Sequence, residues 1–321
     1  DTGSIRVILT NDMLRRINLE CSLDQMIIAD IVFSKSGVAI AKTVYPPDIP
    51  ERRSNFSNIE VYAVLISDVH IGSKHFLKKE FLKFLNWISG ESGDKEIVSK
   101  IKYVVMAGDV VDGMGVYPDQ ENELEILDVV KQYDVLAEYV KQIPDHLNII
   151  IIPGDHDATR KALPQPSIPL QYANQLHSIK NVTMLGNPSY IRIHNVNLLV
   201  YHGRSLTDVV ATTPGLSFYE PNSAMKSLLK IRHLAPMYGS RSPLSPENED
   251  HMVIQNVPDI FHSGHTHTVG AEYYRGTLLV NSGTWQSQTR FQENVGIVPM
   301  PGIVPIVNLS NLDIKIKDFR I

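Results

Sequence analysis

Histidine and aspartate side chains recur along this chain in five short motifs, and each motif directly follows an apolar run. Two divalent cations a few ångströms apart need carboxylates and imidazoles from separate loops, because one carboxylate must bridge both ions. The residue types therefore predict a dinuclear metal centre, with Asp109 as the bridging carboxylate. The candidate ligands are Asp68, His70, Asp109, Asp155, His202, His265 and His267.

The donor types also predict which cation the centre prefers. Imidazole-rich ligation suits Mn²⁺, Fe²⁺ or Zn²⁺ better than Mg²⁺. We expect Mn²⁺ first, with Fe²⁺, Zn²⁺ or Mg²⁺ as alternatives. No single motif carries this interpretation, because an isolated Asp-x-His is usually an ordinary loop and His202 alone would more often be a hydrogen-bonded core histidine. The prediction depends on the motifs occurring together.

The apolar runs before the motifs are typical of strands that are buried on both faces. Ligands collect at the carboxyl ends of strands in open α/β sheets, so the position of the motifs agrees with their chemistry. Apolar residues at helical spacing predict helices over 76–88 and 121–143. This alternation predicts a layered α/β sandwich. The expected strands lie at 61–66, 103–107, 149–153, 198–201, 259–263 and 278–280.

Two segments lack this alternation. The first 44 residues hold short β-type stretches without chemistry, which suggest part of a small barrel. Three prolines and several charges between Tyr45 and Asn55 are typical of a linker, so we place a domain boundary near residue 50 and expect domains over 1–50 and 51–321. The segment 212–246, rich in Pro, Ser and Gly around a helical piece at 223–233, is expected to run over the surface above the site.

Composition bounds the class of protein. Of the 321 residues, 43% are hydrophobic and 20% are charged, which supplies a sizeable core and argues against disordered and fibrous classes. No apolar run reaches the length of a membrane span. The net charge of −5 gives no basic field over the whole chain, so any nucleic acid would be held locally or by a partner. Cys21 is the only cysteine, which agrees with a reducing cytoplasm.

The order of the motifs resembles that of the calcineurin-like metallophosphoesterase superfamily, which includes the double-strand-break repair nuclease. The motifs are Asp-x-His, Gly-Asp-x-x-Asp-Gly, Gly-Asp-His-Asp, His-Gly and Gly-His-x-His, between residues 65 and 284. The resemblance implies a β-sandwich flanked by helices and a two-metal phosphoesterase centre.

Further stretches resemble the small subunit of the archaeal family D DNA polymerases. That resemblance implies an oligonucleotide-binding barrel before the phosphoesterase domain, so residues 1–50 would hold the end of such a barrel. It also implies a proofreading 3′–5′ exonuclease that acts on DNA 3′ ends, with the large polymerising subunit as partner and a sliding clamp reached through the complex. The stretches are Pro164-Gln-Pro, Leu234-Ala-Pro-Met-Tyr-Gly-Ser-Arg, Asn281-Ser-Gly-Thr-Trp-Gln-Ser-Gln-Thr and Pro301-Gly-Ile-Val-Pro-Ile.

The superfamily resemblance assigns a role to each motif residue. His156 would hold no metal and would protonate the leaving oxygen or stabilise its developing charge. Asp157 would orient or polarise His156. One cation would take Asp68, His70, Asp109 and His267, and the other would take Asp109, Asp155, His202 and His265.

One ligand position departs from the family pattern, because the family has Asn where this chain has Asp155. Three ligand carboxylates against two divalent cations leave a formal charge of +1, whereas an Asn would leave +2 for the incoming phosphate. We therefore expect cations to bind, but hydrolysis to be slower than with Asn.

Other residues near the motifs could contact a substrate. Guanidinium groups match phosphate oxygens, although surface ion pairs are an equal alternative. Aromatic rings could stack on an unpaired base, although core packing is the commoner role. Two other functions stay open, a metallophosphatase for small molecules and a non-catalytic B-subunit scaffold of a polymerase. The candidates are Arg160, Arg204 and Arg241 for phosphate, and Tyr117, Tyr238 and Trp285 for bases.

Overall fold

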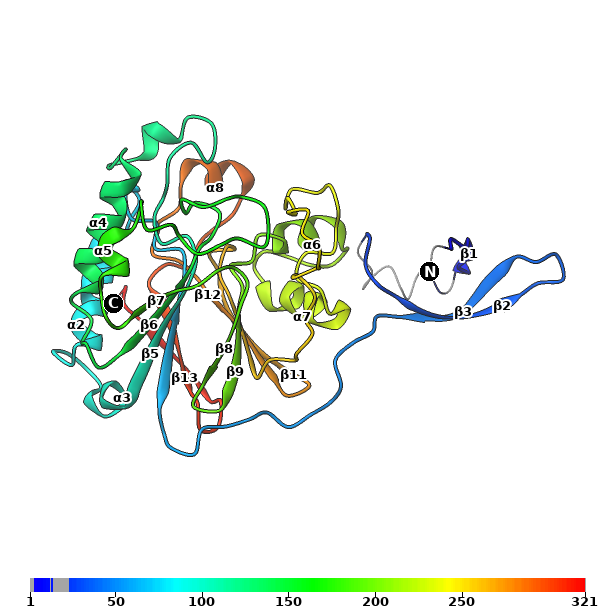
Figure 1. Ribbon diagram of the computed structural model, residues 1–321, viewed down its shortest axis with the longest axis horizontal. Helices are drawn as coiled ribbons and strands as arrows, with labels where there is room; N and C mark the ends of the chain where they lie inside the picture. Colours follow the sequence, from blue (N-terminus) through cyan, green and yellow to red (C-terminus); the bar gives the residue numbers. More distant parts are fainter. Residues whose placement is uncertain (1–2, 12, 14–22, 321) are drawn as a thin grey trace.

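The computed structural model describes residues 3–11, 13 and 23–320, and most of them form a sandwich of two β-sheets (Figure 1). The larger sheet has six strands in the order β14-β13-β4-β5-β6-β7. The strands from β4 to β7 are parallel, whereas β13 and β14 are antiparallel additions. Their bounds are β4 (Tyr62–Ile66), β5 (Ile101–Ala107), β6 (Asn148–Ile152), β7 (Val182–Met184), β13 (Ile303–Asn308) and β14 (Ile314–Asp318).

The second sheet has five strands in the order β11-β12-β10-β9-β8. Its three inner strands are parallel, and the two edge strands are antiparallel to them. Every apolar run expected to be a strand lies in one of these sheets, which confirms the α/β sandwich. The bounds are β8 (Ser189–Ile193), β9 (Val196–Val200), β10 (Ile260–Ser263), β11 (Val269–Tyr274) and β12 (Thr277–Ser282).

The central strands are apolar on both faces because each face has its own core. In β5, Val105 and Ala107 pack between the two sheets, together with Leu198 and Val280 from the other sheet. The alternate residues Val104 and Met106 point outward and pack against helices. A strand covered on both sides needs no polar face, so it reads as a continuous apolar run.

Helices α2 (Lys78–Ile88), α3 (Lys95–Lys100), α4 (Val129–Val140) and α5 (Asn174–His177) flank the six-stranded sheet (Figure 1). The first confirms the helix expected over 76–88. The helix expected over 121–143 is too long, because a short 3₁₀ helix (Gln120–Glu123) ends in extended backbone at Leu124. The chain then donates two hydrogen bonds to the Gly72 carbonyl before Asp128 caps α4.

Helices α6 (Leu206–Thr212) and α7 (Pro221–Ile231) cover the outer face of the five-stranded sheet. The expected surface excursion over 212–246 is therefore wrong for α7. Leu228 and Leu229 are fully buried and belong to one core with Phe261 and Leu279 of the sheet. The physical reason is that an apolar sheet face has to be covered by another layer.

A third, small sheet precedes the sandwich. Its strands are β1 (Val7–Ile8), β2 (Ile28–Phe33) and β3 (Ala39–Tyr45), in the order β1-β3-β2. Figure 1 shows it standing away from the sandwich at the end of an extended segment. A division near residue 50 and a barrel origin of this sheet remain proposals. The single cysteine, Cys21, lies outside the described residues. Within the described part of the chain, no helix has both the length and the apolar character needed to cross a membrane.

Candidate metal centre

The seven candidate ligands come from loops that follow the strands of both sheets, and the fold brings them to one edge of the sandwich. They form overlapping groups whose nitrogen and oxygen atoms lie within 4.8 Å of one another. Five of the seven have a positive φ, between 51° and 69°. Residues other than glycine rarely adopt this backbone, and it concentrates at functional sites. The five are Asp68, His70, Asp109, His265 and His267.

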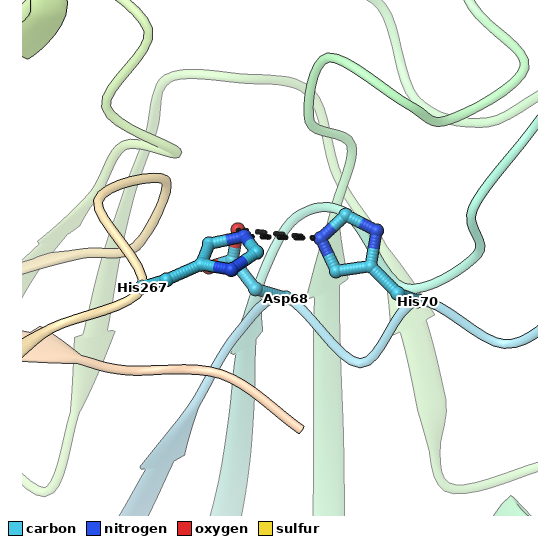
Figure 2. A group of neighbouring side chains, drawn as sticks. All are labelled: Asp68, His70 and His267. Carbon is cyan, nitrogen blue, oxygen red and sulfur yellow. Dashed lines mark hydrogen bonds and ion pairs between the residues drawn. The ribbon is translucent and has the colours of Figure 1, made fainter. Parts of the chain in front are cut away.

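The first group consists of Asp68, His70 and His267, which meet from two distant parts of the chain (Figure 2). His267 Nε2 lies 3.3 Å from Asp68 Oδ1, and His70 Nε2 lies 3.9 Å from the same oxygen. The two ring nitrogens are 3.2 Å apart. Three donor atoms thus converge on one small volume from the loops after β4 and β10.

The second group consists of Asp155, His202 and His265. His265 Nδ1 lies 3.5 Å from Asp155 Oδ2. Asp109 links the two groups, because its Oδ2 lies 3.2 Å from His202 Nε2 and 4.0 Å from His70 Nε2. The other oxygen of Asp109 accepts a hydrogen bond from the His156 N–H at 2.7 Å. One carboxylate oxygen therefore lies between both groups, as a bridging ligand requires.

Two buried atoms at the centre are suited to binding a cation. Among the described residues, Asp68 Oδ1 and His202 Nε2 have no hydrogen-bond partner although both are buried. Burial opposes protonation of His202, but the charge of Asp109 outweighs it and raises the pKa of His202 well above its usual value. A positive charge is thus favoured between His202 and Asp109, and a divalent cation would supply it.

The ligand rings are oriented by hydrogen bonds on their other nitrogens. His70 Nδ1 lies 2.8 Å from Asp112 Oδ1, and His202 Nδ1 lies 2.8 Å from the Ala107 carbonyl oxygen. Both contacts place the N–H on Nδ1 and leave Nε2 to coordinate. Burial also lowers the pKa of His70, which favours the neutral ring that a cation needs.

The remaining two ligand rings have side-chain partners from helical segments. Thr207 Oγ1 of α6 lies 2.8 Å from His265 Nε2. Gln292 Nε2 lies 2.8 Å from His267 Nδ1, while its Oε1 accepts the Thr289 N–H at 3.1 Å. Gln292 belongs to α8 (Arg290–Val295), which begins with a capping box between Thr289 and Gln292. The start of α8 is therefore tied to a candidate ligand.

Glycine at position 154 allows two ligand loops to approach each other. A Cβ on Gly154 would lie 2.3 Å from Asp109 Oδ1 and 2.8 Å from His202 Cε1. Neither contact is possible for a real side chain. The glycine is thus required by the packing of the second ligand group, independently of any turn.

His156 stands beside the ligands and is held through its backbone and its ring. Its Nδ1 lies 2.7 Å from the Asp112 carbonyl oxygen, so Nδ1 carries the proton and Nε2 is the nitrogen left for a substrate. Burial opposes protonation, yet the charges of Asp109 and Asp112 raise the pKa of His156 above its usual value. The ring can therefore hold and release a proton next to the ligand cluster.

Asp157 does not do what the sequence suggested. Its carboxylate accepts hydrogen bonds from the Tyr133 hydroxyl at 3.0 Å and the Gly154 N–H at 2.8 Å, and the carbonyl of Asp112 orients His156 in its place. Burial, reinforced by the charge of Asp109, raises the pKa of Asp157 to about 6. Asp157 supports the ligand loops, and the hydrogen bonds of the described residues do not join its carboxylate to the His156 ring.

Two of the three candidate arginines are engaged with protein groups. Arg204 Nη1 donates to Asp155 Oδ1 at 3.1 Å, and its other nitrogens donate to the Arg241 carbonyl. Arg160 pairs with Glu247 at 2.7 Å on the surface, which is the ion-pair alternative. Only Arg241 of the three lines the cavity described below.

A cavity of about 380 Å³ opens beside the ligands. Tyr117 lines it, whereas Tyr238 is absent from its lining and is 84% exposed. Trp285 is 2% exposed and packs on Phe81 and Phe84, so stacking of a base on Trp285 is excluded. The cavity wall also contains Phe218, Phe291 and Ile297, which the sequence had not singled out.

Sequence reasoning missed Asp112, Thr207 and Gln292. Asp112 had a signal, because it is the second aspartate of the Gly-Asp-x-x-Asp-Gly motif. Thr207 and Gln292 had none, since they contact histidines 58 and 25 residues away. Only the folded chain brings these pairs together.

Among solved structures, the chain is similar to an archaeal phosphodiesterase, with 14% identity and a TM-score of 0.42 over 80% of this chain and 99% of that one. It is also similar to zinc-complexed Vps29 from Entamoeba histolytica, with 14% identity and a TM-score of 0.35 over 81% of this chain and 99% of that one.

Sequence comparison gives closer relatives. The chain is 44% identical to the DNA polymerase II small subunit of Pyrococcus furiosus over 99% of this chain and 53% of that protein. The corresponding subunit of Archaeoglobus fulgidus is 44% identical over 98% of this chain and 64% of that protein. The chain thus spans about half to two thirds of the length of these relatives. The resemblance to polymerase small subunits is confirmed.

A family model that describes the B subunits of DNA polymerases alpha and epsilon matches residues 63–269, which include every candidate ligand. The match begins in β4 and ends at the start of β11, so it includes strands of both sheets but stops before β12, β13 and β14. The chain belongs to the DNA polymerase alpha/epsilon B-subunit family.

Proposed function

We propose that this chain is a two-cation phosphodiesterase that removes nucleotides from DNA 3′ ends, as the proofreading subunit of a replicative DNA polymerase. The observation that carries the proposal is the convergence of four imidazoles and three carboxylates on two adjoining groups. Two of their buried atoms, Asp68 Oδ1 and His202 Nε2, make no hydrogen bond within the described chain and face only other candidate ligands. A scaffold without catalysis has no need of such a cluster.

We assign the candidate ligands to the two cations in the way that the resemblance implies. The group around His70 and His267 would hold one ion, the group around His202 and His265 would hold the other, and Asp109 would bridge them. When bound, the two cations would polarise the phosphate and lower the pKa of an attacking water. Mn²⁺ is the cation that we propose for this donor set.

His156 would protonate the leaving oxygen. Its backbone N–H is fixed on Asp109 and its Nδ1 on the carbonyl of Asp112, so the ring cannot turn away from the cluster. The negative charges of Asp109 and Asp112 favour the protonated ring before the bond breaks. We therefore expect His156 to act as a general acid, which a side chain without an ionisable proton cannot do at this position.

DNA as the substrate and a large polymerising subunit as the partner follow from the relatives' description as polymerase small subunits. We propose both for this chain, with contact to a sliding clamp made through the complex. The net charge of −5 fits this assignment, because the partner would supply most of the phosphate-neutralising surface.

The proposal is tested with single-stranded DNA labelled at either end and with p-nitrophenyl phosphate, in Mn²⁺. We expect stepwise shortening from the 3′ end with release of nucleoside 5′-monophosphates, and loss of this activity in Asp109→Asn. His156→Ala should retain cation binding and lose most of the rate. Hydrolysis of p-nitrophenyl phosphate without DNA cleavage would instead identify a small-molecule phosphatase, and no hydrolysis of either would identify a scaffold.

A further inference from the structure

The cavity beside the ligands has an aromatic wall that the proposed hydrolysis does not use. Three segments far apart in the sequence build this wall, namely the stretch after β5, the turn between α6 and α7, and α8 with the residues that follow it. Phe291 is 58% exposed, which is unusual for a phenylalanine that borders a cavity. The residues of this aromatic wall are Tyr117, Phe218, Phe291 and Ile297.

Two rings of the wall, Tyr117 and Phe291, lie next to each other with a moderate tilt between their planes. The planes of Tyr117 and Phe291 are 30° apart, with ring centroids separated by 6.3 Å. Flat apolar rings beside a phosphate-binding centre match the face of a nucleobase, because every base can stack on an aromatic side chain whatever its sequence.

The Tyr117 side chain and the backbone that carries Phe291 are held in place relative to the candidate ligands. The Tyr117 hydroxyl donates to Glu123 Oε2 at 2.9 Å. Phe291 lies in the first turn of α8, where the capping box of Thr289 and Gln292 sets the helix start. Gln292 in turn contacts His267 at 2.8 Å. A base on this wall would therefore be placed at a defined distance from the cations.

The position of Tyr117 indicates which nucleotide the wall would hold. The Tyr117 ring packs edge-on against His156, with centroids 6.1 Å apart. In the proposed function His156 protonates the leaving oxygen, so the wall lies on the side of the leaving group. For removal of a 3′-terminal nucleotide, that side belongs to the penultimate nucleotide.

We propose that Tyr117 and Phe291 stack on the unpaired base of the penultimate nucleotide and so select frayed or mismatched 3′ ends. The inference rests on the proposed exonuclease function and names the form of DNA that it takes. A base can reach the wall only after leaving its duplex stack, and this costs least where pairing is already broken. Well-paired ends would thereby be spared.

The test compares single-stranded DNA that carries all bases with DNA that is abasic at the penultimate or at the terminal position. We expect the wild type to prefer the intact strand over the penultimate-abasic strand by about tenfold in kcat/KM, the size of one base–aromatic stack. This ratio should fall towards one in Phe291→Ala and in Tyr117→Leu. Loss of the terminal base should lower kcat/KM by less than loss of the penultimate base does.

Three controls keep the result interpretable. Phe291→Leu retains apolar volume but loses the flat ring, so it should behave like Phe291→Ala if stacking is the cause. Phe56→Ala removes an aromatic ring that is 44% exposed and absent from the cavity lining, and it should keep the wild-type ratio. Melting temperatures show whether each variant is folded.

The outcomes separate this inference from the proposed function. An unchanged ratio in both wall variants, or a base effect confined to the terminal position, would overturn the inference while the exonuclease stands. Equilibrium binding of the same strands without added cation gives a second readout. If no strand is cleaved but intact DNA binds more tightly than penultimate-abasic DNA in a manner that depends on Phe291, the stack stands and the exonuclease fails.

Discussion

The Asp112 carboxylate accepts hydrogen bonds from the His70 ring, Gln120 and Gln286. It therefore holds a candidate ligand and is itself held by two further side chains. Partners of this kind typically contribute about 10- to 100-fold to metal affinity or activity. We expect Asp112→Leu to weaken Mn²⁺ binding by that factor, measured by calorimetric titration. Asp112→Asn should lose less, since its amide oxygen can still accept from His70.

The matched control for Asp112 is Asp134 on α4. Its carboxylate accepts from Gln175 at 2.8 Å and has no contact with a ligand. Asp134→Leu should leave the affinity for Mn²⁺ unchanged. If Asp112→Leu also bound Mn²⁺ like the wild type, His70 would not depend on this partner and the assignment of its tautomer would be wrong.

The pair of Asp155 and Arg204 changes the charge argument made from the sequence. Arg204 lies 3.1 Å from the Asp155 carboxylate, and both side chains are largely buried. The guanidinium therefore offsets the extra negative charge that Asp155 carries relative to the family Asn. The slowing expected from Asp155 should be smaller than the formal charges of the ligands suggest.

A double-mutant cycle measures this compensation. Arg204→Met should tighten Mn²⁺ binding and lower kcat/KM, because Asp155 then acts with its full charge. In an Asp155→Asn background the same change should do little. The coupling between the two positions is expected to be about 0.5–3 kcal/mol, as for residues in direct contact. Equal effects of Arg204→Met in both backgrounds would show that the two charges act independently.

At the scale of elements, the question for α7 is whether it is part of a packed layer or of a loose surface segment. Leu228 is fully buried in the core that α7 shares with the five-stranded sheet. We expect Leu228→Ala to lower the free energy of unfolding by about 2–5 kcal/mol. Denaturant melts provide the measurement, with Leu216→Ala as the control because Leu216 is only partly buried against the same core. A loss below that of Leu216→Ala would support the surface excursion.

The sequence predicts those elements whose burial is uniform along their length. β4, β5 and β6 were predictable because both faces of each strand are covered. The start of α4 was not, because the acidic residues from Glu121 onward favour a helix while hydrogen bonds to Gly72 hold the chain extended. Contacts with distant parts of the chain determine where such a helix begins, so local helix propensity cannot predict its first residue.

The same distinction applies to the candidate site. Its ligands could be predicted because each follows a strand, and parallel strands deliver their carboxyl ends to one edge. The hydrogen bonds of Asp157 could not be, because the family resemblance implied that it orients or polarises His156, whereas in the folded chain its carboxylate accepts from Tyr133, 24 residues away. Arg204 was a candidate for phosphate until its partner Asp155 was known.

At the scale of the whole molecule, one end of the sandwich holds the candidate ligands and the other end holds hydrogen bonds that stabilise the fold. The ligands gather at the carboxyl ends of the parallel strands. Asp259 precedes β10 at the opposite end, where its buried carboxylate holds the segment that leads into the sandwich. It accepts from Arg52 at 2.8 Å, the Asn55 N–H at 2.9 Å and the Asn197 N–H at 2.7 Å. Stability and chemistry should therefore be separable by mutation.

Asp259→Leu tests that separation. It leaves several buried donors without an acceptor and is expected to cost about 3–5 kcal/mol, as for breaking a buried ion pair. Because the segment 52–55 then loses the bonds of Arg52 and Asn55 to Asp259, trypsin should cut at Arg52 or Arg53 at temperatures where the sandwich is still folded. Arg52→Met retains the bonds to Asn55 and Asn197 and should cost less. Affinity for Mn²⁺ should stay unchanged in both variants, since the ligands lie at the far end of the strands. A parallel loss of affinity and stability would show instead that the two ends of the sandwich are coupled through the sheets.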